Sequence, residues 1–431
     1  MREGWIERSG VRLHYLEREP EGDAQEPALF MLHGLSSNAL VWGRMAEHLP
    51  GRRMVALDQR SHGPSDRPAE GYASSELVAD AAHAIGELGL GRPLVLGHSW
   101  GASVALDLAA SRPDLAAGLV FVDGPPAAMS RVMSWVEASR RMQPPLPIYT
   151  DLDQAVEAQR QYLGEAWAED LRPFVRAGLV DVEGGLTSTL TVDVRRQILE
   201  QMFDFDPLAD FPKVEGPLLL AMAGLLWPGA PPEFEEGRRR AVEEVLGAVR
   251  GAQARWYDSR HDVPLIRPAE LAADVERAAL AAAFADVARE AAQLDGDWTQ
   301  SVHDEAGGEG GGWQARDLLA HLASTQSSLA AVATARPPAG DGRARQPFDP
   351  DRWNASQVSR RHDSPKEDMV AELRDGARSL HAALMTVDLE QPVAVGPYAG
   401  RPVDDALRRM AAHQRAHLEE LRKVLPAPRT A

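Results

Sequence analysis

Residues 96–103 have the sequence LGHSWGAS, and this short stretch decides the fold of the chain. Its centre, Gly97-His98-Ser99-Trp100-Gly101, matches the pattern G-x-S-x-G. The apolar run PLVL precedes it, and the helix-like run SVALDLAAS follows it. A strand that turns directly into a helix strains the serine backbone and leaves room only for small neighbours. The pattern therefore predicts that Ser99 is a nucleophile, and the alternative is an ordinary turn serine.

Strand-like and helix-like runs alternate on both sides of this stretch. Apolar or alternating runs that predict strands lie at 12–17, 28–34, 53–58, 93–99, 119–126, 217–224 and 254–259. Helical spacing is found at 74–88, 103–111 and 268–280. Strands that alternate with helices predict an α/β fold with a mostly parallel sheet. Residues 127–212 have helical spacing without a strand signal, so we expect an inserted helical cap there.

Length, charge and composition limit the classes of function. A chain of 431 residues suggests two or three domains. The net charge of −18 argues against nucleic acid and against an anionic membrane surface. The absence of cysteine excludes disulfides and cysteine nucleophiles. Without a signal-like N-terminus or a run of about 20 apolar residues, we expect a cytoplasmic protein with a small-molecule partner.

A change of composition marks a domain boundary. The glycine-rich segment at 296–313 breaks the alternating pattern, and long amphipathic helices follow it, separated by polar loops such as 336–351. We place the boundary near 280–285, inside or just after a long alanine-rich helix. The expected domains are residues 1–280, with a cap at about 127–212, and residues 281–431.

Three further segments make residues 1–280 resemble the α/β-hydrolase superfamily. His33-Gly34 follows an early strand, as in the oxyanion loop of that family. Residues 58–66 resemble its D-x-R-G-x-G-x-S loop, with Ser61 where glycine is usual, and residues 259–264 resemble its histidine loop. The resemblance implies that the backbone amides of Leu35 and Trp100 bind the oxyanion of the tetrahedral intermediate.

A serine hydroxyl needs a base to take its proton, and imidazole suits this role near neutral pH. His261 follows the last strand signal, at the position of the family's catalytic histidine. It is therefore the expected base, whereas His98 and His62 are poorer candidates.

The acid that orients His261 is less obvious. Most relatives place an aspartate shortly after the strand written here PLLLAMAG, but no carboxylate follows it until Glu233. Asp123 ends the preceding strand, and some members of the superfamily carry the acid there. We expect Asp123 to hold His261 in its productive tautomer. Two alternatives remain open: Asp123 as a turn residue, and one of the glutamates Glu233, Glu235 and Glu236 as the acid.

These residues predict a serine hydrolase that cleaves a carboxylic ester or lactone without a cofactor at this site. Relatives that open epoxides or remove halides use aspartate at the elbow, so those reactions are disfavoured. Apolar side chains of the cap favour an apolar substrate, although they equally suit packing: Met133, Trp135, Met142, Tyr149, Tyr162, Trp167 and Met202. A non-enzymatic ligand sensor is a further alternative, since this fold also supplies receptors.

The C-terminal part carries a separate pattern of histidines. The run from Trp313 to His321 resembles the second-helix signature of the DinB-like, mycothiol-dependent superfamily. His413 and His417, spaced i and i+4, share one face of a helix. The resemblance implies a four-helix bundle in which His321, His413 and His417 hold a divalent metal, and imidazole suits Zn, Ni or Fe.

The role of this second domain has two interpretations. We expect either a metal-dependent thiol S-transferase, or a structural bundle, or a bundle through which two chains form a homodimer. Gln414 replaces the glutamate of H-E-x-x-H, so the motif is not that of a zinc protease. His303, His362 and His381 have no partner at useful spacing, and we expect them to be surface or packing residues.

Overall fold

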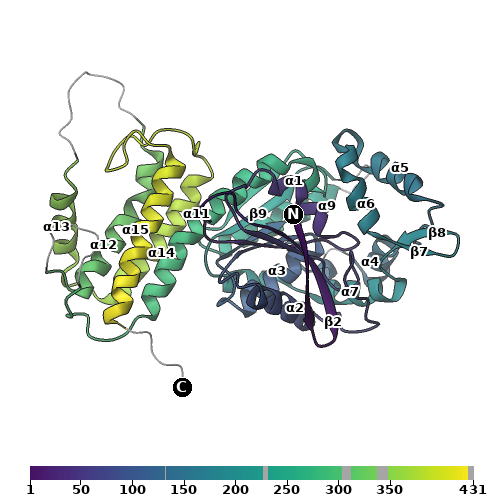
Figure 1. The fold of residues 1–431 in the computed structure, drawn as a ribbon, viewed down its shortest axis with the longest axis horizontal. Coiled ribbons are helices and arrows are strands. Elements are labelled where there is room, and N and C mark those ends of the chain that lie inside the picture. The colour runs from purple at the N-terminus through teal and green to yellow at the C-terminus, as the bar shows by residue number, and fades with distance from the viewer. Residues whose placement is uncertain (132, 227–231, 303–311, 337–347, 426–431) are drawn as a thin grey trace. The chain divides into compact units, whose positions relative to one another are not determined.

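The computed structural model describes residues 1–131, 133–226, 232–302, 312–336 and 348–425 (Figure 1). The chain divides into two compact units, Met1–Ala278 and Ala279–Ala431. The division falls within helix α11 (Pro268–Gln293). The glycine-rich segment and the polar loop expected at 336–351 lie in large part outside the described residues.

The first unit is built on an eight-stranded sheet with the order β1-β2-β4-β3-β5-β6-β9-β10. The strands are β1 (Arg2–Arg8), β2 (Val11–Arg18), β3 (Leu29–Leu32), β4 (Met54–Leu57), β5 (Leu94–His98), β6 (Gly118–Val122), β9 (Leu218–Ala223) and β10 (Gln253–Tyr257). β2 pairs antiparallel with β1 and with β4, and every other pair in this sheet is parallel. The predicted α/β fold with a mostly parallel sheet is confirmed.

The central strands are apolar because both of their faces are covered. Every residue of β3, β4, β5, β6 and β9 is buried, which explains why these strands are near-continuous apolar runs in the sequence. Helices α2 (Ser74–Glu87), α3 (Trp100–Ser111) and α9 (Pro232–Ala248) add Leu77, Leu106 and Val242 to the same apolar core. The unit also contains the short helices α1 (Gly43–Ala46) and α10 (Val263–Ile266).

The cap between β6 and β9 is mainly helical. Its helices are α4 (Trp135–Met142), α5 (Leu152–Leu163), α6 (Arg172–Ala177), α7 (Val192–Asp204) and α8 (Pro207–Asp210). It also contains a hairpin of β7 (Leu179–Val182) and β8 (Gly185–Ser188), so the expectation of no strand at 127–212 is wrong. The strands are short and half-exposed, and their signal was the two-residue turn Glu183-Gly184 between them.

The second unit is helical, as predicted. It contains the later part of α11 together with α12 (Ala315–Thr334), α13 (Pro350–Arg361), α14 (Lys366–Leu384) and α15 (Val403–Val424) (Figure 1). Its apolar core draws on four of these helices, for example through Phe284, Leu329, Leu380 and Leu407. A Cβ added at Gly376 would lie 2.7 Å from the backbone oxygen of Gln326, so glycine is what lets α12 and α14 approach closely here.

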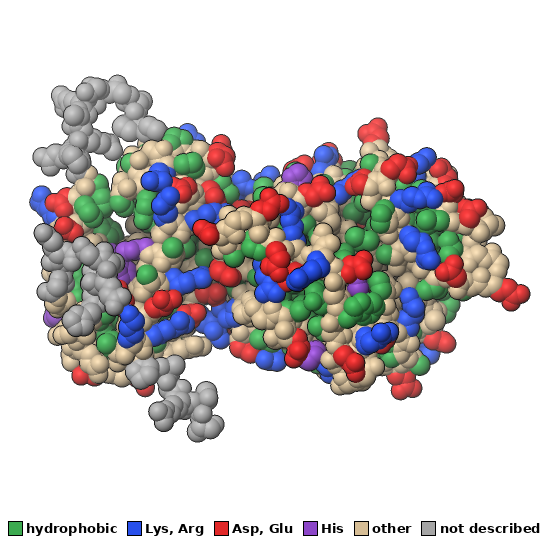
Figure 2. Space-filling model, viewed as in Figure 1, with side chains coloured by type: hydrophobic (Ala, Val, Ile, Leu, Met, Phe, Trp, Pro, Cys, Tyr) green, Lys and Arg blue, Asp and Glu red, His purple; other side chains and the backbone are tan. Residues whose placement is uncertain are grey.

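The surface is charged in both signs. On the face seen in Figure 2, Lys and Arg side chains are interspersed with Asp and Glu over both units. Among the described residues, no helix is long and apolar enough to span a lipid bilayer.

Candidate active site

Ser99 lies in a tight turn between β5 and α3. Its backbone has φ 56° and ψ −120°, a conformation that is strained for any residue with a side chain. A Cβ added at Gly97 would lie 2.2 Å from the backbone oxygen of Gly101, and one added at Gly101 would lie 2.4 Å from that of His33. The glycines of the motif are therefore required by space, as the pattern implies.

Three segments far apart in the sequence bring a hydroxyl, an imidazole and a carboxylate together. Ser99 Oγ lies 2.9 Å from His261 Nε2, and His261 Nδ1 lies 2.6 Å from Asp123 Oδ2. Asp123 follows β6 directly, and His261 lies in the loop after β10. With Nδ1 protonated, Nε2 is free to accept the proton of Ser99.

The surroundings hold Asp123 in place. Its side chain is 6% exposed, and its Oδ1 accepts hydrogen bonds from the backbone N–H of Ala223, at 3.0 Å, and from the guanidinium of Arg238 on α9. The second oxygen, Oδ2, faces His261. The two oxygens are thus committed to different partners, which fixes the orientation of the carboxylate.

Electrostatics favour the charged pair. Loss of solvent lowers the pKa of His261, but the hydrogen bond and charge of Asp123 outweigh it, and the pKa is raised above its ordinary value of 6.5. Burial raises the pKa of Asp123, yet the hydrogen bond and charge of His261 and the charge of Arg238 lower it overall. Asp123 is therefore an anion that stabilises the imidazolium form of His261.

The alternative acids lie elsewhere. Glu233, Glu235 and Glu236 are on α9, where Glu235 accepts a hydrogen bond from Arg239 at 3.0 Å. Part of the loop that usually bears the acid, residues 227–231, lies outside the described residues. Among the described carboxylates, Asp123 is the one hydrogen-bonded to His261.

The loop that contains Gly34 and Leu35, which is expected to supply one of the oxyanion amides, lies next to Ser99. A Cβ added at Gly34 would lie 3.0 Å from Ser99 Cβ, and Leu35 lines the same cavity as Ser99. Trp100 is the first residue of α3, where backbone N–H groups have no partner within the helix. Both expected donors therefore belong to segments that adjoin Ser99.

The remaining histidines of this region shape loops. His33 Nδ1 lies 2.8 Å from the backbone oxygen of Gly34, and its Nε2 accepts from the N–H of Gln59. Burial lowers the pKa of His33 to about 3 and that of His62 to about 4, so both rings are neutral. His98 Nε2 lies 2.9 Å from the backbone oxygen of His261 and positions the histidine loop.

A cavity of about 380 Å³ adjoins Ser99 and His261, and we call it the catalytic cavity. Its wall comes from residues 34–38, from the prolines of 144–147 and from cap helices. Of the apolar cap residues singled out in the sequence, Tyr149 and Tyr162 line it. Four others pack against the main core instead: Met133, Trp135, Met142 and Met202. The polar residues Asn38, Gln159 and Arg195 also line the cavity, and no sequence pattern had indicated them.

The second unit brings its three predicted histidines together. His413 Nε2 lies 3.2 Å from the Nε2 atoms of both His321 and His417, and one nitrogen from each ring lies within 4.8 Å of the others. Burial, followed by the charges of the other two histidines, lowers the pKa of His321 to about 3. Glu420 Oε2 lies 3.1 Å from His417 Nδ1 and orients that ring. Three imidazoles whose ring nitrogens converge fit a divalent metal.

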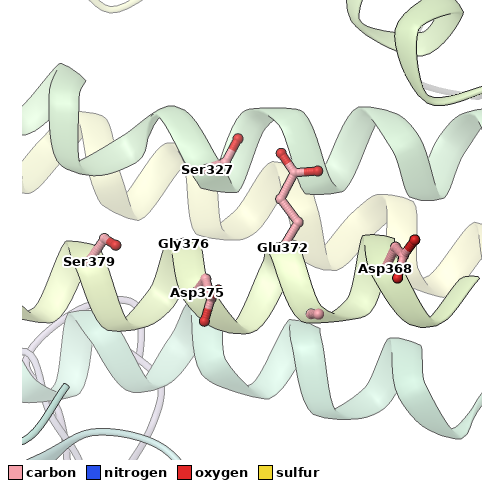
Figure 3. A pocket seen from close by; sticks show the side chains of 7 residues that line it. Ser327, Asp368, Glu372, Asp375, Gly376 and Ser379 are labelled. Atoms are coloured by element: carbon pink, nitrogen blue, oxygen red, sulfur yellow. The ribbon is translucent and has the colours of Figure 1, made fainter. Parts of the chain in front are cut away.

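Another hollow lies between α12 and α14 (Figure 3). Its acidic side chains come from α14, and Glu372 points toward the helix that carries Ser327. Glu372 is paired with Arg361 at 2.5 Å, and Asp375 is paired with Arg378 at 3.1 Å. These ion pairs account for Glu372 and Asp375, and Asp368 alone marks no site, so we assign none here.

The sheet, the strained serine turn and the neighbouring histidine define the class of α/β hydrolases. The model of the alpha/beta hydrolase family matches residues 29–275, and the chain belongs to this family. Residues 280–422 match the model of the mycothiol maleylpyruvate isomerase N-terminal domain. The chain therefore joins a hydrolase domain to a helical domain of that second type, as the two resemblances in the sequence predicted.

Curated relatives include hydrolases of several kinds. A 2-(acetamidomethylene)succinate hydrolase of Mesorhizobium japonicum is 33% identical over 37% of this chain and 57% of its own length. Lipase LipV of Mycobacterium tuberculosis is 34% identical over 39% of this chain and 61% of its own. The sn-1-specific diacylglycerol lipase ABHD11 of Mus musculus is 29% identical over 56% and 78%. The chain thus spans less than two thirds of the first two relatives.

Solved structures agree with the fold. A thioesterase domain from the curacin biosynthetic pathway matches with a TM-score of 0.51 and 22% identity, over 63% of this chain and 98% of that one. E-2-(acetamidomethylene)succinate hydrolase matches with a TM-score of 0.51 and 20% identity, over 64% and 99%. At these identities the likeness shows the fold alone. Family model and relatives together place residues 29–275 in the alpha/beta hydrolase family, and several of these relatives are hydrolases.

Proposed function

We propose that this chain is a serine hydrolase that cleaves a carboxylic ester or a lactone, with Ser99 as nucleophile, His261 as base and Asp123 as the orienting acid. The observation that carries the proposal is the unbroken hydrogen-bonded series from Ser99 Oγ through both ring nitrogens of His261 to Asp123. The lipases among the relatives favour an ester substrate.

The reaction proceeds in two halves. As Ser99 Oγ attacks the carbonyl carbon, His261 Nε2 takes its proton, and Asp123 stabilises the imidazolium. The amides of Leu35 and Trp100 donate to the oxyanion of the tetrahedral intermediate. His261 then returns the proton to the departing alkoxide, which leaves an acyl-serine. A water molecule then gives a proton to His261 and attacks the acyl carbon. His261 passes this proton to Ser99 Oγ as the bond between Oγ and the acyl carbon breaks, which releases the carboxylic acid and restores the serine.

A fluorophosphonate probe and a panel of esters and lactones test this function. The probe should label Ser99, and Ser99→Ala should lower kcat by about 10⁶-fold. Ser111→Ala is a matched control, because Ser111 is an exposed serine at the other end of α3 whose hydroxyl donates to the backbone oxygen of Asp107 in the same helix. Unchanged hydrolysis in Ser99→Ala would refute the proposal.

A second candidate function belongs to the histidine cluster. We infer that His321, His413 and His417 hold a divalent metal, Zn, Ni or Fe, and that this domain carries out metal-dependent thiol S-transfer. When bound, such a metal lowers the pKa of a thiol that binds to it. The convergence of the three ring nitrogens supports this inference. Elemental analysis of the purified chain, together with a thiol-transfer assay, tests it.

A further inference from the structure

Arg195 brings a positive charge to the wall of the catalytic cavity. It lies on α7 of the cap and lines the cavity together with Ser99 and His261. The residue is only 8% exposed. The other cavity-lining residues include no lysine or second arginine, and Asp262 next to His261 is the acidic residue among them. No ion pair joins Asp262 to Arg195 among the described residues, so one guanidinium gives its part of the wall a positive charge.

This guanidinium has a neutral partner only. Its Nη2 donates to Ser36 Oγ at 2.8 Å, and its Nε has no hydrogen-bond partner among the described residues. No carboxylate within the described parts of the chain pairs with it. Burial lowers the pKa of Arg195, and no neighbouring acid offsets that effect. A buried cation without a counter-charge is costly.

Other buried arginines of the same unit differ in this respect. Arg52 is paired with Glu276 at 2.7 Å, and Arg60 is paired with Asp80 at 2.7 Å. A structural arginine in this unit is thus satisfied by an acid of the chain itself. Arg195 departs from that pattern at the place where a ligand would enter.

The hydrogen bond from Arg195 to Ser36 places the positive charge close to the reacting groups. Its partner Ser36 follows Leu35, whose amide is the expected oxyanion donor, and Ser36 N–H donates to His62 at 3.1 Å. Ser36 has a φ of 62°, so this turn is held in a special conformation. The guanidinium is therefore anchored beside the oxyanion loop while its charge remains uncompensated.

We propose that Arg195 binds a carboxylate of the substrate, so that the Ser99 site acts on an anionic ester or lactone. This inference rests on the proposed function and gives its substrate class. The substrate anion supplies the missing counter-charge, and guanidinium and carboxylate form strong, directional pairs. Binding energy at this remote group positions the scissile carbonyl against Ser99. The apolar wall formed by Leu146, Val175 and Leu179 suits the carbon chain between the two ends.

The first test is a binding measurement that needs no turnover. In the Ser99→Ala protein, titration calorimetry compares monomethyl half-esters with the matching dimethyl diesters, from succinate to suberate. We expect the best half-ester to bind about 10- to 100-fold more tightly than its diester, as for a hydrogen bond to a charged group. Equal binding of the two members throughout the series, or no binding of any half-ester, would overturn the inference.

Substitutions then assign the preference to one residue. In the Ser99→Ala background, Arg195→Gln should remove most of the preference for half-esters, and Arg195→Lys should retain part of this preference. Arg196→Gln is the matched control, because Arg196 is the next residue of α7, its side chain is 57% exposed, and its guanidinium lies 3.8 Å from the carboxylate of Glu200. This variant should retain the full preference for half-esters. A preference that survives in Arg195→Gln refutes the assignment. If Arg195→Gln does not fold, the Arg195→Lys comparison and the half-ester test still decide.

Turnover by the wild-type chain separates the two proposals. Hydrolysis of half-esters and diesters at the same kcat/KM would refute the carboxylate-binding role and leave the serine hydrolase intact. Failure of Ser99 to react with the fluorophosphonate and with every ester would refute the proposed serine hydrolase. The carboxylate-binding role of Arg195 would then be judged separately, from the binding measurements on the Ser99→Ala protein.

Discussion

Asp123→Asn keeps the size of the side chain but changes which atoms can donate hydrogen bonds. In the wild type, Oδ1 accepts from Ala223 N–H, at 3.0 Å, and from Arg238. Because both partners are donors, the oxygen of an asparagine must take this position. Its NH₂ group then occupies the place of Oδ2, which lies 2.6 Å from His261 Nδ1.

The consequence is a histidine in the wrong tautomer. An NH₂ group can only donate, so His261 Nδ1 must accept, and the ring proton moves to Nε2. That nitrogen lies 2.9 Å from Ser99 Oγ and can no longer take the serine proton. The negative charge that stabilises the imidazolium is lost as well. We expect kcat to fall by about 10⁴-fold, or about 5.5 kcal/mol in the activation free energy.

Initial rates on the best ester measure this effect, and thermal unfolding checks that the variant is folded. Glu233→Gln, Glu235→Gln and Glu236→Gln serve as controls that should retain wild-type rates. An Asp123→Asn protein within about 10-fold of the wild type would refute the tautomer argument. A large loss in one of the glutamate variants would transfer the role of acid to α9.

Three further outcomes follow from the structure. Since Asp123 raises the pKa of His261 and Arg238 lowers it, kcat/KM should fall as the pH drops through a value above 6.5, and Arg238→Gln should move this acid limb to higher pH; a move to lower pH would count against the assignment. His413→Ala should abolish metal content in elemental analysis, whereas His362→Ala, at an exposed side chain, should retain it; metal that persists in His413→Ala would refute the site. Gly376→Ala should destabilise the helical unit by about 1–3 kcal/mol, and calorimetry that finds an unchanged transition would contradict the close approach of α12 and α14.

Most of the fold could be predicted from short-range patterns in the sequence. The buried parallel strands are recognisable in the sequence because both of their faces are apolar, and the serine turn is recognisable because only small residues fit around it. Strand β1 was not predicted, since it lies at the sheet edge and Ile6 is its one buried residue. The hairpin of β7 and β8 was missed for a related reason: its strands are four residues long and only Leu186 is buried.

Contacts between distant segments were decided by the tertiary structure. The sequence by itself determined an α/β hydrolase domain with a serine turn and a histidine loop, followed by a helical unit, because each of these is a short-range pattern. It left the acid open between Asp123 and three glutamates, since that choice depends on where two separate strands end. It gave no sign of Arg195, because an arginine on an amphipathic cap helix resembles any surface residue until the fold buries it against Ser36, far away in the chain.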